Sequence, residues 1–155
     1  MSLYGSHIHP LLVAALNTKG NIIEMGAGDF STPLLHGLSE YYNRRLYTYE
    51  SDGEWLKRFA HFSSPLHSIS FVRNWDDVKP QGGLVLIDHA PAERRMVDII
   101  RFKDIAEVLV VHDTNKAKFY GYNFDAFKYK FLYDKVEQTT TLVSNFVDVS
   151  KFRGW

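Results

Sequence analysis

The chain has 155 residues, 45% hydrophobic and 23% charged, which is enough apolar material for one domain with a single core, and we expect residues 1–155 to form one. Its 18 basic and 18 acidic side chains cancel, so nothing in the net charge favours nucleic acid or a charged membrane surface as a partner. The absence of cysteine excludes disulfides and thiolate metal sites and suits a cytoplasmic location.

The first predicted element is a helix that ends at Asn17-Thr18-Lys19-Gly20. Its apolar face comprises Ile8, Leu11, Leu12, Ala15 and Leu16. The run from Leu11 to Leu16 is too short to span a bilayer. His7 and His9 stand at its start, and we interpret them as surface histidines; the alternative is that one of them forms a lid near a cofactor.

Residues 21–33 predict a buried strand, a glycine turn and the start of a helix. Gly26 and Gly28 allow a tight turn and let a ligand lie against bare backbone. Thr32 is expected to be the N-cap, and Pro33 fits the first helical position. Doubly wound α/β folds build a cofactor pocket from such a unit, at the carboxyl end of the strand.

The motif Glu24-x-Gly26-x-Gly28-x-x-Ser31 departs from the dinucleotide fingerprint, which has glycine in place of Ser31. A carboxylate such as Glu24 would also repel a pyrophosphate. The motif resembles the first motif of class I S-adenosylmethionine-dependent methyltransferases. The resemblance implies that these four residues hold the amino-acid end and the sulfonium of S-adenosylmethionine. A glycine turn with a purely structural role is the alternative.

Residues 45–50 predict a second strand, which ends in the carboxylate of Glu50. Its separation from Ser31 is close to the spacing at which Rossmann-type folds place an acid on a ribose diol. We therefore predict that Glu50 binds the cofactor ribose. The alternative is that Glu50 caps the helix that follows.

Residues 67–72 predict a third strand, and the turn after it contains Trp75, Asp76 and Asp77. In the methyltransferases that the chain resembles, this turn meets the adenine. The resemblance implies that Trp75 stacks on the base and that Asp76 or Asp77 accepts a hydrogen bond from its amine. A tryptophan packed under the sheet is the alternative. Only about ten residues lead to the next strand, too few for a full crossover helix.

The next two predicted strands are aliphatic runs that end in polar residues, at 83–91 and 106–115. One ends in Asp88-His89 and the other in His112-Asp113. The carboxyl ends of neighbouring parallel strands meet at one edge, so we predict that these four side chains form the catalytic site. The alternative is that these acids cap the helices that follow. Capping explains the residues at one strand end more easily than it explains those at both strand ends together.

These strand ends resemble those of the catechol O-methyltransferase type and of cephalosporin hydroxylase-like proteins, which share the fold. The first resemblance implies that Asp88 and Asp113 bind Mg²⁺, which polarises an acceptor hydroxyl. Thr114 departs from that pattern because it stands where an asparagine is expected. A metal-free site with His89 or His112 as general base is the alternative.

The last third of the chain is rich in aromatic residues, some of which, within 119–122, are predicted to form an acceptor pocket. A short helix is expected near 123–128, followed by a strand, and residues 139–149 are expected to pair antiparallel with that strand. The helix after the fourth strand is expected to turn inward Met96, Val97, Ile99 and Ile100.

This order of elements resembles the three-layer Rossmann-like methyltransferase fold, whose mostly parallel sheet has the order 3-2-1-4-5-7-6 with the last strand antiparallel. The resemblance implies an S-adenosylmethionine-dependent methyltransferase that methylates a small-molecule or sugar hydroxyl, with or without Mg²⁺. One alternative is a non-catalytic cofactor-binding or partner protein on this fold. Another is an NAD-dependent oxidoreductase, disfavoured by Ser31 and Glu24. The sequence leaves monomer and homodimer open.

Overall fold

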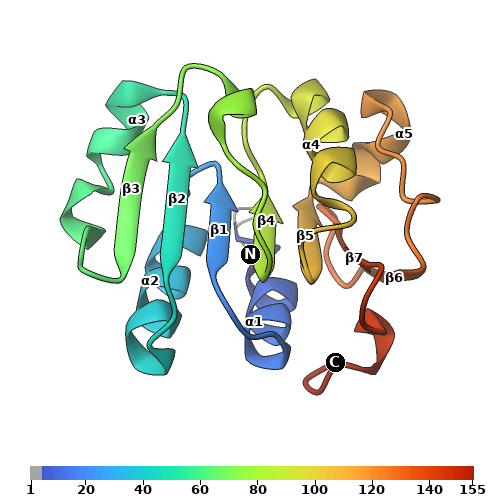
Figure 1. The fold of residues 1–155 in the computed structure, drawn as a ribbon. Coiled ribbons are helices and arrows are strands. Elements are labelled where there is room, and N and C mark those ends of the chain that lie inside the picture. The colour runs from blue at the N-terminus through green and yellow to red at the C-terminus, as the bar shows by residue number, and fades with distance from the viewer. Residues whose placement is uncertain (1–4) are drawn as a thin grey trace.

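A computed structural model of the protein describes residues 5–155 as a seven-stranded sheet with helices on both faces (Figure 1). The strands are β1 (Ile22–Met25), β2 (Leu46–Glu50), β3 (His67–Phe71), β4 (Leu84–Ile87), β5 (Val108–His112), β6 (Tyr129–Tyr133) and β7 (Thr140–Ser144). The helices are α1 (Ile8–Asn17), α2 (Ser31–Tyr42), α3 (Gly53–Lys57), α4 (Arg95–Phe102) and α5 (Ala117–Tyr120).

The strand order is β3-β2-β1-β4-β5-β7-β6, as predicted. Strands β1 to β5 pair in parallel, whereas β7 runs antiparallel to both β5 and β6. The carboxyl ends of the five parallel strands therefore meet at one edge of the sheet (Figure 1). The short crossover after β3 is confirmed too, because the connection from β3 to β4 contains a 3₁₀ turn at Trp75–Asp77 and no α-helix.

Side chains alternate between the two faces of the sheet and form two apolar clusters. Odd-numbered residues of the central strands, such as Val85, pack towards α4, where Ile99 is fully buried. Even-numbered residues, such as Leu84, pack towards α1 and α2. This parity extends past the strand ends, where it decides on which face each polar residue lies.

Helix α4 faces the sheet with a different stripe from the one predicted. Its buried residues include two charged ones, Arg95 and Asp98. With Ile99 and Phe102 they make an i, i+3, i+4, i+7 stripe, so the predicted Met96, Val97 and Ile100 lie 39–45% exposed instead. A prediction based on apolar residues alone misplaces this helix because ion pairs, rather than hydrophobic burial, occupy half of its inner face.

The segment after β5 also differs from the prediction. Its helix is α5, which is followed by Gly121 in a left-handed conformation (φ +75°), and residues 123–128 are irregular with a turn at 125–126. The backbone N–H of Asp125 donates to the side chain of Asn123, a local bond that competes with helix formation. In the last segment β7 is shorter than expected, and the chain ends its pairing at Ser144.

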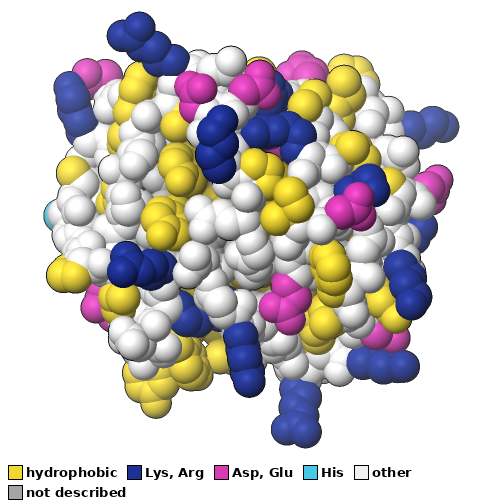
Figure 2. Space-filling model, in the orientation of Figure 1, with side chains coloured by type: hydrophobic (Ala, Val, Ile, Leu, Met, Phe, Trp, Pro, Cys, Tyr) yellow, Lys and Arg dark blue, Asp and Glu magenta, His cyan; other side chains and the backbone are white. Residues whose placement is uncertain are grey.

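The molecular surface is mixed in charge. On the face shown in Figure 2, lysine and arginine side chains are interspersed with aspartate and glutamate, and apolar side chains lie among them in small groups. Of the helices in residues 5–155, none is long and apolar enough to cross a membrane.

Glu24 is the polar centre that joins β1 to its neighbours. Its carboxylate is fully buried and accepts hydrogen bonds from the hydroxyls of Thr48 on β2 (2.7 Å) and Thr32 on α2 (2.9 Å). Helix α2 begins at Ser31, two residues before the predicted start at Pro33, so Phe30 and not Thr32 holds the N-cap position. Burial raises the pKa of Glu24 from 4.5 to about 7, although the two threonine hydroxyls oppose the shift.

This buried carboxyl generates a pH prediction. The folded chain favours the neutral form of Glu24, so Glu24 stabilises the fold below pH 4.5, and this contribution is lost as the pH rises through about 7. We expect the wild type to lose about 3 kcal/mol of unfolding free energy relative to Glu24→Gln across that range. The measurement is chemical denaturation of both proteins between pH 4.5 and about 8.

The difference between the two proteins is the quantity to compare. Burial lowers the pKa of His7 and of His67 to about 4, so these histidines make stability rise with pH over part of the same range. They are present in both proteins and cancel in the difference. Parallel pH profiles for wild type and Glu24→Gln would contradict the prediction.

Candidate functional site

A cavity of about 510 Å³ opens at the carboxyl edge of the sheet, beside the glycine turn after β1. It lies where open α/β sheets bind their ligands. The cavity is lined by Gly5, His7, Ala27, Gly28, Asp29, Phe30, Trp55, Asp88, His112, Asp113 and Gln138. Of the predicted site residues, the lining includes Gly28, Asp88, His112 and Asp113.

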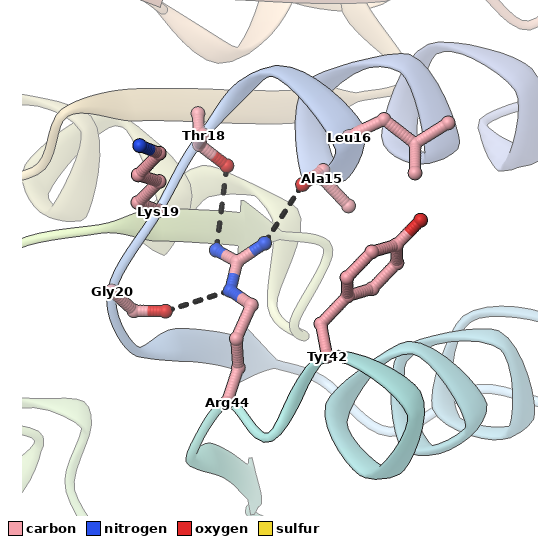
Figure 3. A pocket seen from close by; sticks show the side chains of 7 residues that line it. All are labelled: Ala15, Leu16, Thr18, Lys19, Gly20, Tyr42 and Arg44. Atoms are coloured by element: carbon pink, nitrogen blue, oxygen red, sulfur yellow. Dashed lines mark hydrogen bonds between the residues drawn. The ribbon is translucent and has the colours of Figure 1, made fainter.

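A second cavity, of about 410 Å³, lies at the opposite edge of the sheet, where β1 and β2 begin (Figure 3). Its centre is the guanidinium of Arg44, which donates to the carbonyls of Gly20 (2.8 Å) and Ala15 (2.7 Å) and to the hydroxyl of Thr18 (3.4 Å). These bonds tie α1 to the start of the sheet. Arg44 therefore has a structural role, and this cavity lacks the acids and imidazoles found at the carboxyl edge.

The first glycine of the turn serves the approach of two strands. Gly26 has φ +98°, and a Cβ there would lie 2.8 Å from the backbone of Asp88 and His89. Any other residue would force β1 and β4 apart at the point where the site is built.

The second glycine lines the cavity, but its backbone N–H is already used. Gly28 N–H donates to Thr32 Oγ1 (3.0 Å), and a Cβ at Gly28 would lie 3.0 Å from Ser31 Oγ. Ser31 itself is 1% exposed. Gly26, Ser31 and the buried Glu24 thus shape and support the turn from below, whereas Gly28 and the residues after it face the cavity.

Glu50 also supports this turn. Its Oε2 accepts from the N–H of Ala27 (3.0 Å), and its Oε1 accepts from the N–H groups of Ser51 (2.6 Å) and Asp52 (2.9 Å). The side chain is 6% exposed and is absent from the cavity lining. The acid predicted for a ribose diol is directed here at backbone amides, and it fixes the turn against the end of β2.

Trp55 on α3 is the aromatic residue of the cavity, and the sequence prediction missed it. Its indole N–H donates to the carbonyl of Ala27 (2.7 Å). The guanidinium of Arg58 stacks on its ring at 4.1 Å and pairs with Asp29 at 2.9 Å. The only feature of the sequence that could have indicated Trp55 is its position shortly after Glu50, because Glu50 ends a strand at the carboxyl edge of the sheet.

Trp75 and Asp76 do not lie at the cavity. Trp75 is 5% exposed, packs in the α4-side cluster and donates its indole N–H to the carbonyl of Ala90 (3.0 Å). Its ring faces are therefore closed to an adenine, because core side chains cover them. Asp76 forms an ion pair with Arg94 on the outside of the same loop.

The residues that follow β4 and β5 lie on opposite faces of the sheet, according to whether their numbers are even or odd. Asp88 and His112 continue the even-numbered face towards α1, and both line the cavity. His89 continues the odd face, is 1% exposed, and has Nε2 2.9 Å from Asp98 Oδ2 on α4. His89 is therefore buried under the sheet, and of the two histidines predicted for the site only His112 lines the cavity.

His112 lies between a carboxylate and a hydroxyl. Its Nδ1 is 3.1 Å from Asp88 Oδ1, and its Nε2 is 2.8 Å from Ser6 Oγ. Asp113, which adopts a left-handed conformation (φ +57°), places Oδ1 3.7 Å from the same Nε2. Burial would raise the pKa of Asp88, but the hydrogen bond with His112 and the charge of Arg95 outweigh burial and lower that pKa.

Arg95 fastens the two strand ends together from the α4 side. It is 6% exposed and donates to the carbonyls of His89 (2.7 Å), Asp88 (3.0 Å) and His112 (3.3 Å). It also pairs with the carboxylates of Asp88 (3.1 Å) and Asp113 (3.5 Å). Arg95 is the first residue of α4, and it was not among the residues predicted to form the site.

This guanidinium bears on the predicted Mg²⁺ site. A cation shared by Asp88 and Asp113 would stand beside a buried positive charge that already bridges both carboxylates. Mg²⁺ also requires near-octahedral oxygen ligation, and Thr114 Oγ1 is engaged with the hydroxyls of Thr139 and Thr141. The residues present do not fit a Mg²⁺ ion held by this pair.

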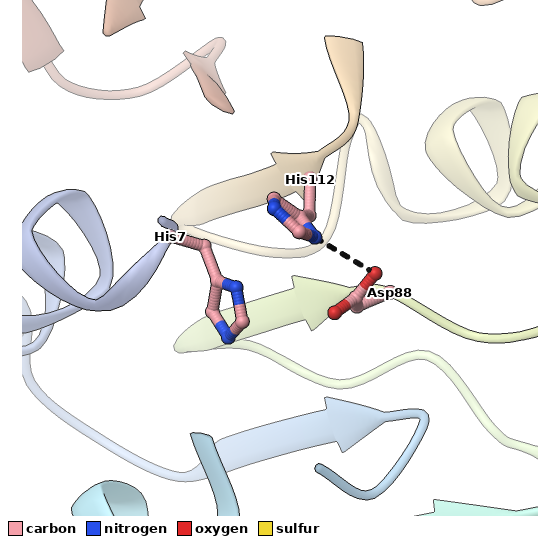
Figure 4. Close-up of side chains that lie close together, drawn as sticks. All are labelled: His7, Asp88 and His112. Carbon is pink, nitrogen blue, oxygen red and sulfur yellow. Dashed lines mark hydrogen bonds and ion pairs between the residues drawn. The ribbon is translucent and has the colours of Figure 1, made fainter. Parts of the chain in front are cut away.

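His7 completes the wall of the cavity from the start of α1 (Figure 4). It is 5% exposed, with its ring centroid 4.4 Å from that of His112, so it is not the surface histidine favoured from the sequence. Neither of its ring nitrogens has a hydrogen-bond partner among residues 5–155. Burial lowers its pKa to about 4.

The aromatic segment predicted as an acceptor pocket lies elsewhere. Phe119 is 82% exposed, and the hydroxyl of Tyr122 donates to the carbonyl of Ala92 (3.0 Å) while its ring packs in the α4-side cluster. Neither lines the cavity beside the glycine turn.

Comparison with known proteins finds no matching family model, and no curated protein matches the sequence. Solved structures do match. A methyltransferase from Pyrococcus furiosus superposes with a TM-score of 0.61 at 12% identity, covering 90% of this chain and 83% of that one. The N-terminal domain of human METTL16, in complex with SAH, matches with a TM-score of 0.57 at 10% identity over 91% of this chain and 69% of that one.

Spermidine synthase from Thermotoga maritima matches with a TM-score of 0.61 at 13% identity. The match covers 97% of this chain but only 62% of the synthase, so the chain spans about three fifths of that protein. At such low identities these matches concern the backbone and not the site. With the strand order and the antiparallel β7, they show that this chain has the Rossmann-like fold of the class I methyltransferases.

Proposed function

We propose that the protein is an S-adenosylmethionine-dependent methyltransferase that methylates a hydroxyl group of a small molecule. The observation that supports this most is the cavity at the glycine turn, lined by carboxylates on a fold shared with methyltransferases. S-adenosylmethionine would supply an electrophilic methyl group on a sulfonium.

The size and charge of the cavity suit that cofactor. Its volume of about 510 Å³ is within the range of small-molecule sites. Asp29, Asp88 and Asp113 line it, whereas Arg58 and Arg95, which pair with them, are outside the lining, so the three carboxylates outnumber the two guanidinium groups beside them. Carboxylates stabilise a sulfonium and an ammonium but repel the pyrophosphate of NAD, so the charge disfavours the oxidoreductase alternative.

Within this proposal Trp55, and not Trp75 as expected from the sequence, is the aromatic residue that contacts the cofactor. Trp55 is held by Ala27 and Arg58 beside the turn, and it offers its ring to the cavity. Glu24 and Glu50 act indirectly, because they hold the turn in the shape that the cofactor would meet. A rigid turn matters because in-line methyl transfer depends mainly on positioning.

Asp88 and His112 would deprotonate the acceptor. With its proton on Nδ1, His112 donates to Asp88, and its unprotonated Nε2 accepts from Ser6 Oγ until the hydroxyl of the acceptor takes that place. The acceptor oxygen would bond to the methyl carbon as the carbon–sulfur bond breaks, with the sulfur keeping the electron pair and the proton passing to Nε2. The modest volume of the cavity and the neutral chain favour a small acceptor over a polyanion.

We predict that S-adenosylhomocysteine binds with micromolar affinity and quenches the fluorescence of Trp55, because the ligand would lie against that ring. Titration calorimetry measures the affinity, and fluorescence titration of tryptophan variants locates the contact. The quench should disappear in Trp55→Phe and persist in Trp155→Phe, whose ring packs on Phe131, outside the cavity.

NAD⁺ serves as the ligand control, and Glu54→Gln serves as the control for α3, since Glu54 is exposed and outside the cavity. Preference for NAD⁺ would favour the oxidoreductase alternative. Absence of binding to either ligand would reject the enzyme proposal and favour a non-catalytic partner protein on this fold.

For turnover, we predict that His112→Gln and Asp88→Asn each lower kcat by about 10²–10⁴-fold, the usual contribution of a positioned general base. The assay follows S-adenosylhomocysteine release on an acceptor found by screening hydroxylated small molecules. His9→Ala is the matched control, because His9 is an exposed histidine near the same helix start. Unchanged kcat in both site variants would show that the proton leaves by another route.

A further inference from the structure

We propose that His7, Asp88 and His112 form a binding site for a divalent transition-metal ion, distinct from the Mg²⁺ pair expected from the sequence. Each residue offers one ligand atom, and the three atoms lie within 4.8 Å of one another (Figure 4). The three side chains come from the start of α1 and the ends of β4 and β5. This inference concerns ion binding alone and stands whether or not the methyltransferase proposal holds.

The spacing of two of these ligands already suits an ion. Zn²⁺ binds histidine nitrogen and carboxylate oxygen at about 2.0–2.2 Å, so neighbouring ligand atoms of a tetrahedral site lie roughly 3.3 Å apart. His112 Nδ1 and Asp88 Oδ1 are 3.1 Å apart. His7 adds the third ligand from the facing helix.

His7 supplies the independent observation. It is 5% exposed, yet neither ring nitrogen has a hydrogen-bond partner among the described residues. A buried polar group without a partner is destabilising, and its presence calls for a partner of another kind. The ring lies against His112 at the cavity wall, where a bound ion would satisfy one nitrogen.

The surroundings of His112 match those of a ligating histidine. Such a histidine binds the metal through one nitrogen and donates the other N–H to a neighbouring oxygen. Ser6 Oγ lies 2.8 Å from Nε2, which leaves Nδ1 for the ion. Binding would shift the ring proton from Nδ1 to Nε2, so with the ion bound His112 would no longer be a free base.

Arg95 does not exclude this site as it excludes the Mg²⁺ pair. It approaches the strand ends from the α4 face, whereas His7 approaches from the α1 face. The hydrogen bond with His112 and the ion pair with Arg95 both use Oδ1 of Asp88, so an ion bound between Oδ1 and His112 Nδ1 would replace the hydrogen bond while Arg95 stays on the α4 side of the carboxylate. Asp113, the other predicted metal ligand, has its Oδ2 turned towards Arg95.

The donor set indicates the class of ion. Two imidazoles and one carboxylate suit Zn²⁺, Fe²⁺ or Co²⁺, whereas Mg²⁺ prefers oxygen ligands. All three ligands line the cavity, so the remaining coordination positions would face it and accept water or a substrate oxygen. In that place the ion would supply Lewis-acid polarisation of a bound hydroxyl.

The test is metal titration of tag-free protein without S-adenosylhomocysteine. We expect one equivalent of Zn²⁺ to bind with micromolar or tighter affinity by calorimetry, and Co²⁺ to give visible absorption typical of nitrogen and oxygen ligation at low coordination number. Mg²⁺ should bind more weakly than either. Thermal unfolding should shift upward with Zn²⁺ because the ion would join α1 to the sheet.

Two variants identify the ligands. His7→Leu removes a ligand of the ion. Its effect on the Zn²⁺ affinity should therefore exceed the effect of removing a ligand's hydrogen-bond partner, which is roughly 10–100-fold. In metal-free protein it should unfold at the same or a higher temperature, because it removes a buried group without a partner. Ser6→Ala should lower the affinity by about 10–100-fold, as expected of a positioning residue. His9→Ala, on the exposed neighbouring histidine, should change nothing.

The inference is overturned if neither Zn²⁺ nor Co²⁺ binds at micromolar concentration. It is also overturned if His7→Leu binds Zn²⁺ as the wild type does, or if Mg²⁺ binds more tightly than Zn²⁺ and is lost in Asp113→Ala. Failure of the methyltransferase proposal would appear separately, as absent binding of S-adenosylhomocysteine to metal-free and metal-loaded protein.

Discussion

The buried guanidinium of Arg95 is the interaction on which the site depends. It binds three backbone carbonyls at the ends of β4 and β5 and two carboxylates beyond them, so it sets how far apart Asp88, His112 and Asp113 stand. A charge buried among so many acceptors is held in one place, since loss of any partner would leave part of it uncompensated. It also places a positive charge between Asp88 and Asp113, the two aspartates predicted to bind Mg²⁺.

Alternation of side chains along the strands divides the polar residues between two functions. His89 lies on the α4 face, close to Asp98, in a charged network under the sheet. Asp88 and His112 lie on the α1 face, where they meet the cavity and His7. Two adjacent Asp-His and His-Asp dipeptides thus contribute one histidine to the core and one to the proposed chemistry.

The two buried glutamates near the glycine turn stabilise the turn. Glu24 and Glu50 point at threonine hydroxyls and backbone amides, and together they hold the glycine turn from both sides. Buried carboxylates need such donors, because an unpaired charge away from water is costly. What the turn presents to the cavity is therefore Gly28, Asp29 and the ring of Trp55, which are the contacts expected to meet a ligand.

The sequence by itself determined the sheet order, the edge that carries the site and the delivery of Asp88, His112 and Asp113 to that edge. The sheet order came from the resemblance of the element order to methyltransferases, whereas the strand ends and the glycine turn follow from local periodicity, which a short window of sequence encodes. Only the tertiary structure decided that Trp75 is buried, that Trp55 and His7 face the cavity, and that Arg95 bridges the strand ends. Those outcomes depend on contacts between distant segments, such as Ser6 with His112, and on which buried polar groups find partners. Local pattern does not specify such pairings, because burial and hydrogen bonding are decided by the whole packed chain.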